Sequence, residues 1–286
     1  KRWHSVSPCF GVATMTRILG IETSCDETGI AVVEDGRKIL ADIVASQTAL
    51  HAQFGGVVPE LASRQHIITI AELTQRVLEK CEDSVDAVAC TQGPGLMGSL
   101  LVGINFGKAF ALARDLPFVP VHHIEGHMFA AFLEHPNNTT GIPQYPFLAL
   151  VVSGGHTCLI TCPEPHQYNI LGTTRDDAVG ECFDKVARLL GLSYPGGPAI
   201  QRAASNGDPH AFKFPRAMSK KDSLEFSYSG LKTAVLYTVR DLGNTVQENP
   251  STLANLAASF QHAAIDILVE KTKLALNLTG FKRLVV

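Results

Sequence analysis

The fold is constrained most by a strand–turn–strand unit that occurs twice along the chain. An apolar run at residues 17–22 is separated from a second run at 30–33 by a short polar stretch. Residues 147–152 and 158–161 repeat this arrangement around the polar turn at 153–157. Apolar runs joined by short turns favour antiparallel hairpins. We therefore expect an α/β chain with two duplicated, strand-rich lobes and a cleft between them, with the two polar turns facing each other across it.

The rest of the chain alternates helical and strand patterns. After a third strand at 39–45, Pro59 and Glu60 suit the first turn of a helix that continues to about Lys80. The glycines at 195–198 are expected to form a sharp loop before another helix and to let a ligand come close to the backbone. Further elements are predicted as strands at 85–90, 118–121 and 281–286 and as helices at 100–113 and from His123 onward.

Composition limits the class of protein. With 286 residues, of which 45% are apolar and 18% charged, the chain is long enough for two lobes with cores and is not disordered. No apolar run approaches the length of a membrane span, so no membrane partner is expected. The formal net charge of −3 gives no global signal for nucleic acid, so such a partner needs a local patch. Seven cysteines without a C-x-x-C pair indicate reduced thiols in a cytosol-like compartment.

Three parts are expected along the chain: an extension at 1–14, an N-terminal lobe at 15–120 and a C-terminal lobe at 121–286. The first part carries basic residues and no acid, which suits an upstream extension or the remnant of a transit peptide. We expect a cytoplasmic protein, with a mitochondrial one as the alternative if the first part is a transit remnant. Met15 is the more natural start, and the last strand stops without a cap or turn, so the chain is expected to be a fragment.

The densest cluster of metal-ligating side chains comprises His122, His123 and His127. Residues four apart on a helix share a face, so His123 and His127 can bind one divalent metal such as Zn or Fe. The zinc-protease pattern H-E-x-x-H needs a Glu directly after its first His, and Ile124 stands there instead. A packing or surface role remains the alternative, because a catalytic metal usually takes three protein ligands and no nearby residue clearly supplies the third.

Three other segments carry candidate chemistry. The turn at 153–157, with the sequence SGGHT, exposes backbone N–H groups that can cradle a phosphate, although a plain hairpin turn is the alternative. Asp26 in the first polar turn can position a metal, a water or a nucleophile, or it is a solvated turn acid. The charges around Asp184 are expected to lie mostly on the wet face of a helix.

A further cluster mixes bases with aromatic residues. This mixture suits a nucleic-acid surface, and a solvated loop fits the composition equally well. The members are Lys213, Arg216, Lys220, Lys221, Lys232, Phe212, Phe214, Phe226 and Tyr228.

Six segments together resemble one protein family. They read GIETSCDETG at 20–29, GGVVPELASR at 55–64, HHIEGH at 122–127, SGGHT at 153–157, FDK at 183–185 and YPGGP at 194–198. These long, specific motifs are similar to those of the TsaD family of tRNA threonylcarbamoyladenosine transferases, once classed as O-sialoglycoprotein endopeptidases. The resemblance extends from about Met15 to Val286.

The resemblance implies a fold, an activity and partners. The fold is the two-lobed actin/Hsp70/sugar-kinase (ASKHA) fold, with its C-terminal part missing from this chain. The activity is transfer of the threonylcarbamoyl group from threonylcarbamoyl-adenylate to N6 of adenosine 37 in tRNAs that read codons beginning with A, with release of AMP. The implied partners are tRNA and threonylcarbamoyl-adenylate, with accessory proteins of the TsaB and TsaE type or a second copy of the chain in a homodimer.

The family pattern also implies roles for particular residues. His123 and His127 hold one divalent metal, Fe2+ or Zn2+, and Asp26 is the carboxylate near the reacting centre. The family continues past Val286 with a turn that contacts adenosine and an Asp that is the third metal ligand. The chain as given is therefore expected to bind metal weakly, and its turnover is in doubt. The adenylate site is lined by Val151, Val152, Ser153, Gly154, Gly155, Asp184 and Gly197.

The implied chemistry suits these parts. The mixed anhydride is already activated, with AMP as its leaving group, so the enzyme must orient the acyl carbon against a poor nucleophile and stabilise charge on the carbonyl and phosphate oxygens. A Lewis-acidic metal and turn N–H groups do both, and Asp26 is the hypothetical acceptor of the amine proton. Three alternatives stay open: a small-molecule kinase of the same fold, the metallopeptidase once assigned, and an inactive truncated paralogue.

Overall fold

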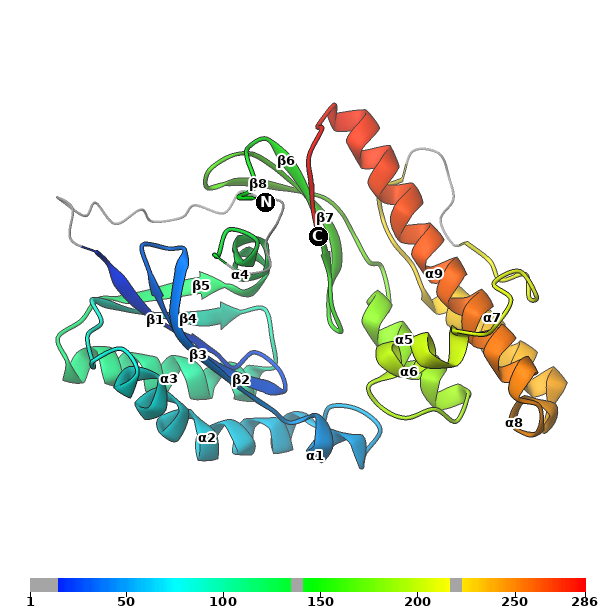
Figure 1. The fold of residues 1–286 in the computed structure, drawn as a ribbon, viewed down its shortest axis with the longest axis horizontal. Helices are drawn as coiled ribbons and strands as arrows, with labels where there is room; N and C mark the ends of the chain where they lie inside the picture. The colour runs from blue at the N-terminus through cyan, green and yellow to red at the C-terminus, as the bar shows by residue number, and fades with distance from the viewer. Residues whose placement is uncertain (1–14, 135–140, 217–222) are drawn as a thin grey trace. The chain divides into compact units, whose positions relative to one another are not determined.

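The computed structural model describes residues 15–134, 141–216 and 223–286, which fall into two compact units. Of the described residues, those from 15 to 142 belong to the first unit and those from 143 to 286 to the second (Figure 1). The predicted boundary after residue 120 would fall inside a strand, because β5 (Phe118–His122) pairs with its neighbour in the sheet of the first unit. The predicted extension at 1–14 lies outside the described residues.

The first unit is built on a five-stranded sheet in the order β3-β2-β1-β4-β5. The first three strands form an antiparallel meander, and the other two run parallel to β1. This confirms the predicted hairpins, although β2 begins three residues earlier than its apolar pattern, so the polar turn is shorter than expected. The strands are β1 (Arg17–Glu22), β2 (Glu27–Glu34), β3 (Lys38–Ser46), β4 (Ala87–Gly93) and β5.

Helices of the first unit pack their apolar stripes on this sheet. The second helix begins at Pro59 as predicted, and buries Ile70, Leu73 and Val77, a helical spacing, among the strand residues Leu19 and Ile30. It packs alongside the next helix on one face of the sheet (Figure 1). The helices are α1 (Thr48–Ala52), α2 (Pro59–Glu79), α3 (Met97–Ala113) and α4 (His123–Ala130).

The second unit repeats the topology of the first. Its sheet has the order β8-β7-β6-β9, in which an antiparallel meander is followed by a strand parallel to the first one. This order matches β3-β2-β1-β4 strand for strand, which confirms the duplicated units of the predicted ASKHA fold. The strands are β6 (Phe147–Val152), β7 (Thr157–Glu164), β8 (Gln167–Thr173) and β9 (Leu284–Val285).

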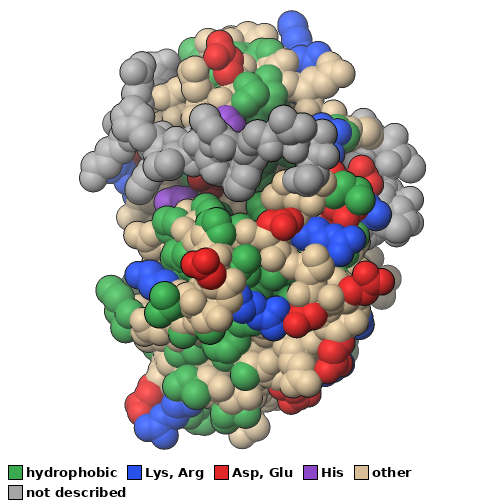
Figure 2. Space-filling model, turned by 90° about the vertical axis from the view of Figure 1, so that its left-hand side faces the viewer, with side chains coloured by type: hydrophobic (Ala, Val, Ile, Leu, Met, Phe, Trp, Pro, Cys, Tyr) green, Lys and Arg blue, Asp and Glu red, His purple; other side chains and the backbone are tan. Residues whose placement is uncertain are grey.

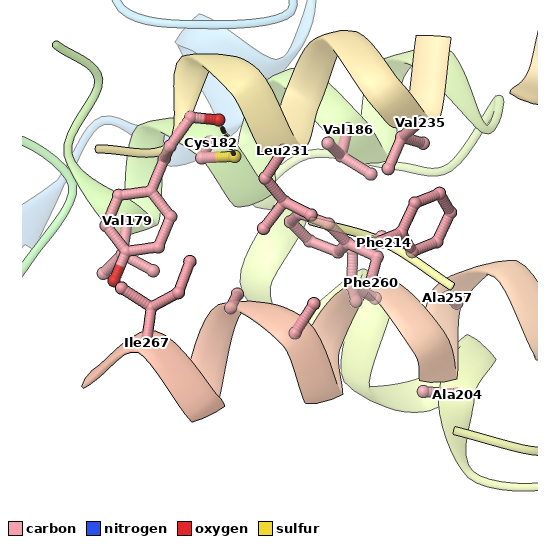
Figure 3. Packing of buried hydrophobic residues seen from close by; sticks show 14 of the residues in the cluster. Val179, Cys182, Val186, Ala204, Phe214, Leu231, Val235, Ala257, Phe260 and Ile267 are labelled. Atoms are coloured by element: carbon pink, nitrogen blue, oxygen red, sulfur yellow. Dashed lines mark hydrogen bonds between the residues drawn. The ribbon is translucent and has the colours of Figure 1, made fainter. Parts of the chain in front are cut away.

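One long helix organises the core of the second unit. The Asn249 side chain accepts hydrogen bonds from the backbone N–H groups of Ser251 and Thr252 at its start, and Gly280, at φ +70°, ends it in the left-handed conformation. Its buried face carries Phe260 and small residues, which lie against α5 and α7 (Figure 3). The helices are α5 (Val179–Leu189), α6 (Gly196–Ala204), α7 (Ser229–Leu242), α8 (Thr245–Glu248) and α9 (Pro250–Thr279).

The described helices include none that is both long and apolar enough to cross a membrane.

Two leucines on α9 test this packing, because they differ in burial. Leu256 is fully buried, whereas Leu278 is 65% exposed. Leu256→Ala is expected to lower the free energy of unfolding by about 2–5 kcal/mol, because it leaves a cavity in the core. Leu278→Ala is the matched control, with a change below about 1 kcal/mol. Urea denaturation followed by circular dichroism measures both, and equal losses would contradict the orientation of α9.

Candidate functional site

The predicted histidine pair lies on α4, directly after β5. His123 and His127 are one helical turn apart, and their Nε2 atoms are 3.1 Å from each other, with ring centroids at 4.4 Å. Burial, together with the neighbouring His123 ring, lowers the pKa of His127 below its ordinary value, which favours the neutral imidazole. His122 precedes the helix in an extended conformation and does not share the face of the pair. The structure therefore brings together the two imidazoles that the spacing selected.

The spacing of the two nitrogens suits a shared metal ion. Two nitrogens that each lie about 2.0–2.1 Å from one metal, at an angle of about 90–110°, are about 2.8–3.4 Å apart. The observed 3.1 Å between His123 Nε2 and His127 Nε2 falls inside this range. Within residues 15–134, 141–216 and 223–286, however, no three His, Cys, Asp or Glu side chains gather into a group that could hold a metal. The pair therefore fits two positions of a coordination shell.

A third group, which the sequence analysis did not select, touches the pair from the other side. Glu22 ends β1, and its Oε2 lies 3.2 Å from His123 Nδ1 and accepts a hydrogen bond from the Thr91 hydroxyl at 2.5 Å. The backbone N–H of Ser24 donates to Glu22 Oε1, and Ser24 Oγ lies 3.2 Å from His123 Nδ1. Burial opposes ionisation of Glu22, but the hydrogen bonds that it accepts outweigh burial and lower the pKa of this carboxyl to about 2.

Asp26 lies in the turn that Glu22 holds. The Asp26 carbonyl accepts a hydrogen bond from the Gln47 N–H at 3.0 Å, which ties the turn to the residue before α1. Although Cys25 is an exposed residue, desolvation of its thiol and the adjacent Asp26 charge raise the pKa of that thiol to about 12, so it stays protonated at neutral pH. Through Ser24, the turn contacts His123, which places two predicted elements of the site in one region of the first unit.

The polar turn of the second unit lies against the start of a helix. The Ser153 hydroxyl accepts from the N–H groups of Gly155 at 3.3 Å and His156 at 3.0 Å, so the turn is held by its own side chain. The first residue of α5 donates its N–H to Thr157 Oγ1 at 2.9 Å. A Cβ on Gly180 would lie 2.6 Å from the Ser153 carbonyl oxygen, so the helix N-terminus meets the turn at backbone contact. Because N–H groups of this turn already donate to the Ser153 hydroxyl and the His156 carbonyl, the positive end of the α5 dipole is the feature here that favours an anion.

Two other predicted adenylate residues, Asp184 and Gly197, lie on α5 and at the start of α6. Asp184 accepts the N–H of Gly196 at 2.7 Å, which joins α5 to the first turn of α6. The glycines expected in a loop before α6 therefore begin that helix instead. A Cβ on Gly196 would lie 2.5 Å from Asp184 Cα, whereas a Cβ on Gly197 would meet open space. The structure thus brings Asp184 and Gly197 to one corner of the second unit.

Two valines of the predicted adenylate site differ in the exposure of their side chains. Val151 is buried in the sheet, and Val152 is 39% exposed at the end of β6. A ligand at the turn can therefore reach the side chain of Val152, whereas the side chain of Val151 belongs to the interior.

The prediction of a mixed basic and aromatic surface is wrong for three of its four aromatic members; the fourth, Phe212, is partly buried. Phe226 and Tyr228 are fully buried and Phe214 is 5% exposed, so their rings cannot stack on bases. Lys232 forms an ion pair with Asp177 at 2.6 Å. These rings belong to the core beneath α9, which covers them (Figure 3). Lys220 and Lys221 lie outside the described residues.

The position after His123 offers no catalytic base. Ile124 is buried, at 8% exposure, so its side chain belongs to the interior of the first unit. This disfavours the metallopeptidase alternative, because that chemistry needs a carboxylate at this place.

Comparison with known proteins identifies the family to which this chain belongs. A family model described as TsaD, tRNA N6-adenosine threonylcarbamoyltransferase, matches residues 38–286. Two relatives of that same name, from Anaeromyxobacter dehalogenans strains 2CP-1 and 2CP-C, are each 53% identical over 275 residues, which is 95% of this chain and 80% of the relative. A distant likeness, at 13% identity and a TM-score of 0.46, is component A of (R)-2-hydroxyglutaryl-CoA dehydratase from Acidaminococcus fermentans, and it covers 94% of this chain and 92% of that one. The chain belongs to the tRNA N6-adenosine threonylcarbamoyltransferase family.

Proposed function

We propose that this chain carries out the transfer of its family with a metal held by His123 and His127 and a nucleotide held at the turn of residues 153–157. The reaction moves a threonylcarbamoyl group to N6 of an adenosine in tRNA, and we assign adenosine 37 of tRNAs that read codons beginning with A as the acceptor. Threonylcarbamoyl-adenylate is the donor. The observation that carries the proposal is the pair of Nε2 atoms 3.1 Å apart, with a carboxylate on the far side of one ring.

The metal part of the proposal is supported by the chemistry of the pair. Imidazole nitrogens bind Fe2+ or Zn2+ in the neutral form, and the lowered pKa of His127 favours that form. A divalent cation there would supply Lewis acidity toward a carbonyl or phosphoryl oxygen of the substrate. In this proposal the two histidines would bind the divalent cation and fix its position, and they have no other role.

The nucleotide part is supported by the second unit. The N-terminus of α5, which lies against the turn at 153–157, offers the positive end of a helix dipole to the adenylate phosphate. Val151, Val152, Ser153, Gly154 and Gly155 supply the backbone of that phosphate site. We assign Asp184 and Gly197 to the nucleoside part of the ligand, because a carboxylate accepts hydroxyl protons and a bare glycine leaves room for close approach.

Residues of this chain can account for every bond and proton of the transfer step. The N6 nitrogen attacks the carbamoyl carbon and forms the new C–N bond, the bond from that carbon to the phosphate oxygen breaks, and AMP leaves with the electron pair. The proton from N6 passes to the Asp26 carboxylate, which we propose as the general base. Cys25 is not a covalent nucleophile in this scheme, because the pKa of its thiol is raised to about 12.

The tRNA partner is held by local contacts in this proposal. The net charge is −3, and basic and acidic side chains are interspersed on the face drawn in Figure 2. The charge of the protein therefore does not provide a uniform positive potential that would attract the phosphate backbone of tRNA. Accessory proteins of the TsaB and TsaE type, a homodimer and the predicted compartment stay predictions.

Metal content tests the histidine pair and separates this proposal from a small-molecule kinase, which needs no such pair. The double variant His123→Ala/His127→Ala is expected to lose bound Fe2+ or Zn2+, because two ligands are removed. His166→Asn is the matched control, since His166 is exposed in a turn at φ +62°, a conformation that Asn tolerates. Equilibrium dialysis against a known concentration of the metal, followed by mass spectrometry of the protein compartment, measures the bound metal. A double variant that holds as much metal as the wild type would contradict the site.

The role of Asp26 is tested by turnover. Asp26→Asn keeps the shape of the side chain and removes the base, so the rate of threonylcarbamoyladenosine formation is expected to fall about 100-fold or more. The control is Asp42→Asn, an exposed acid on β3 of the same unit. Unmodified tRNA is incubated with threonylcarbamoyl-adenylate, and mass spectrometry of the digested nucleosides reads the product. Full turnover by Asp26→Asn would remove the assignment.

Two adjacent glycines at the start of α6 allow the effect of packing to be measured apart from the effect on ligand binding. Gly196→Ala is expected to lower the free energy of unfolding by about 1–3 kcal/mol, because its Cβ meets the Asp184 backbone. Gly197→Ala meets open space, so stability should be unchanged or rise by up to about 1 kcal/mol, while AMP binds more weakly. Urea denaturation and calorimetric titration with AMP measure the two effects. Unchanged AMP affinity in Gly197→Ala would argue against its place in the nucleotide site.

A further inference from the structure

The two ring nitrogens of His123 face different partners. Nε2 faces His127 Nε2 at 3.1 Å, and Nδ1 faces Glu22 Oε2 and Ser24 Oγ, each at 3.2 Å. An ionised carboxylate only accepts hydrogen bonds, so its contact with Nδ1 requires the proton on that nitrogen. A neutral imidazole with Nδ1–H has its lone pair on Nε2. The carboxylate therefore selects the tautomer whose Nε2 lone pair is directed toward His127.

We propose that Glu22 is a positioning residue for the metal, which fixes the tautomer and the orientation of His123 so that Nε2 faces the ion. This inference rests on the proposed metal function of the histidine pair. A hydrogen bond from the non-ligating ring nitrogen to a carboxylate also raises the basicity of the ligating nitrogen. Glu22 itself lies on the Nδ1 side of the ring, which is the side away from the pair, so it orients a ligand and is not one.

The rest of the surroundings of Glu22 supports this role over a purely structural one. Across the described ranges, no lysine or arginine forms an ion pair with Glu22. Glu34, at the end of the next strand in the same sheet, instead pairs with Arg17 and Lys38. Two cationic side chains therefore neutralise the Glu34 carboxylate, whereas the Glu22 carboxylate lies against the His123 imidazole. A negative charge placed there favours a cation at the far side of the ring.

Two further hydrogen bonds hold the carboxylate in this position. The Thr91 hydroxyl donates to Oε2 from the end of β4, and the Ser24 N–H donates to Oε1 from the turn that carries Asp26. Rotation of the carboxylate away from His123 would break both bonds, which come from two different segments. The same carboxylate thus holds both the metal-ligating ring and the turn of the proposed base.

Zinc affinity measures this role without turnover. Glu22→Gln keeps the size of the side chain but removes the charge, and its amide can donate to Nδ1 and stabilise the wrong tautomer. We expect the dissociation constant for Zn2+, from competition with a chromophoric chelator, to rise about 10–100-fold. Thr91→Val, which loosens the carboxylate, should raise it by a smaller factor. Glu72→Gln, at an exposed acid on α2, is the charge control and should bind Zn2+ as the wild type does.

The tautomer of His123 is read directly by nitrogen-15 NMR of the metal-free protein. The wild type should show the proton on Nδ1, and Glu22→Gln should populate the Nε2–H form. Wild-type protein with the proton on Nε2 would overturn the inference even if the variant fails to fold. Wild-type zinc affinity in Glu22→Gln, alongside loss of zinc in His123→Ala/His127→Ala, would overturn the role of Glu22 alone. Retained zinc in the double histidine variant would overturn the metal site and this inference together.

Discussion

The parallel pairing of β1, β4 and β5 is the constraint on which the site of the first unit depends. Parallel strands end at the same edge of a sheet, so residues that follow their carboxyl ends are brought together regardless of their distance in sequence. Ile21 pairs with Cys90, and Thr91 pairs with Val121. One step further along, Glu22, Thr91 and the first turn of α4 meet at that edge. The hydrogen-bonded cluster around His123 is a direct result of this register.

The second unit reaches its candidate anion site by a different route. There the turn between two antiparallel strands meets the start of α5, and Thr157 caps that start by accepting the Val179 N–H. The contact is possible because Gly180 has no Cβ to hold the helix away from Ser153. Asp184, one turn later on the same helix, fixes the start of α6. The helix α5 therefore joins the turn at 153–157 to the start of α6 at Gly196, although these segments lie far apart in the sequence.

The sequence predicted much of this, and its failures have physical causes. Apolar periodicity located most strands and the helices α2 to α6 but not β8, α7 or the long helix α9, and the i, i+4 spacing of the histidines predicted their shared face. Glu22 was missed because a carboxylate at the end of a strand looks like any other turn acid until the parallel register brings Thr91 and α4 to it. The aromatic residues Phe226 and Tyr228 were misread as a surface because composition does not indicate what covers a segment, and α9 lies far along the chain.

The glycines of the second unit fall into two groups, those that packing requires and those that it does not require. Gly180 and Gly196 are required by packing, because a Cβ at either position would lie within 3 Å of backbone atoms. Gly154, Gly155 and Gly197 have room for a Cβ and take no positive φ, so neither packing nor backbone conformation requires them. A glycine in the first turn of a helix costs stability relative to alanine. The space beside these three residues leaves room for a ligand close to the backbone, as the proposed nucleotide site requires.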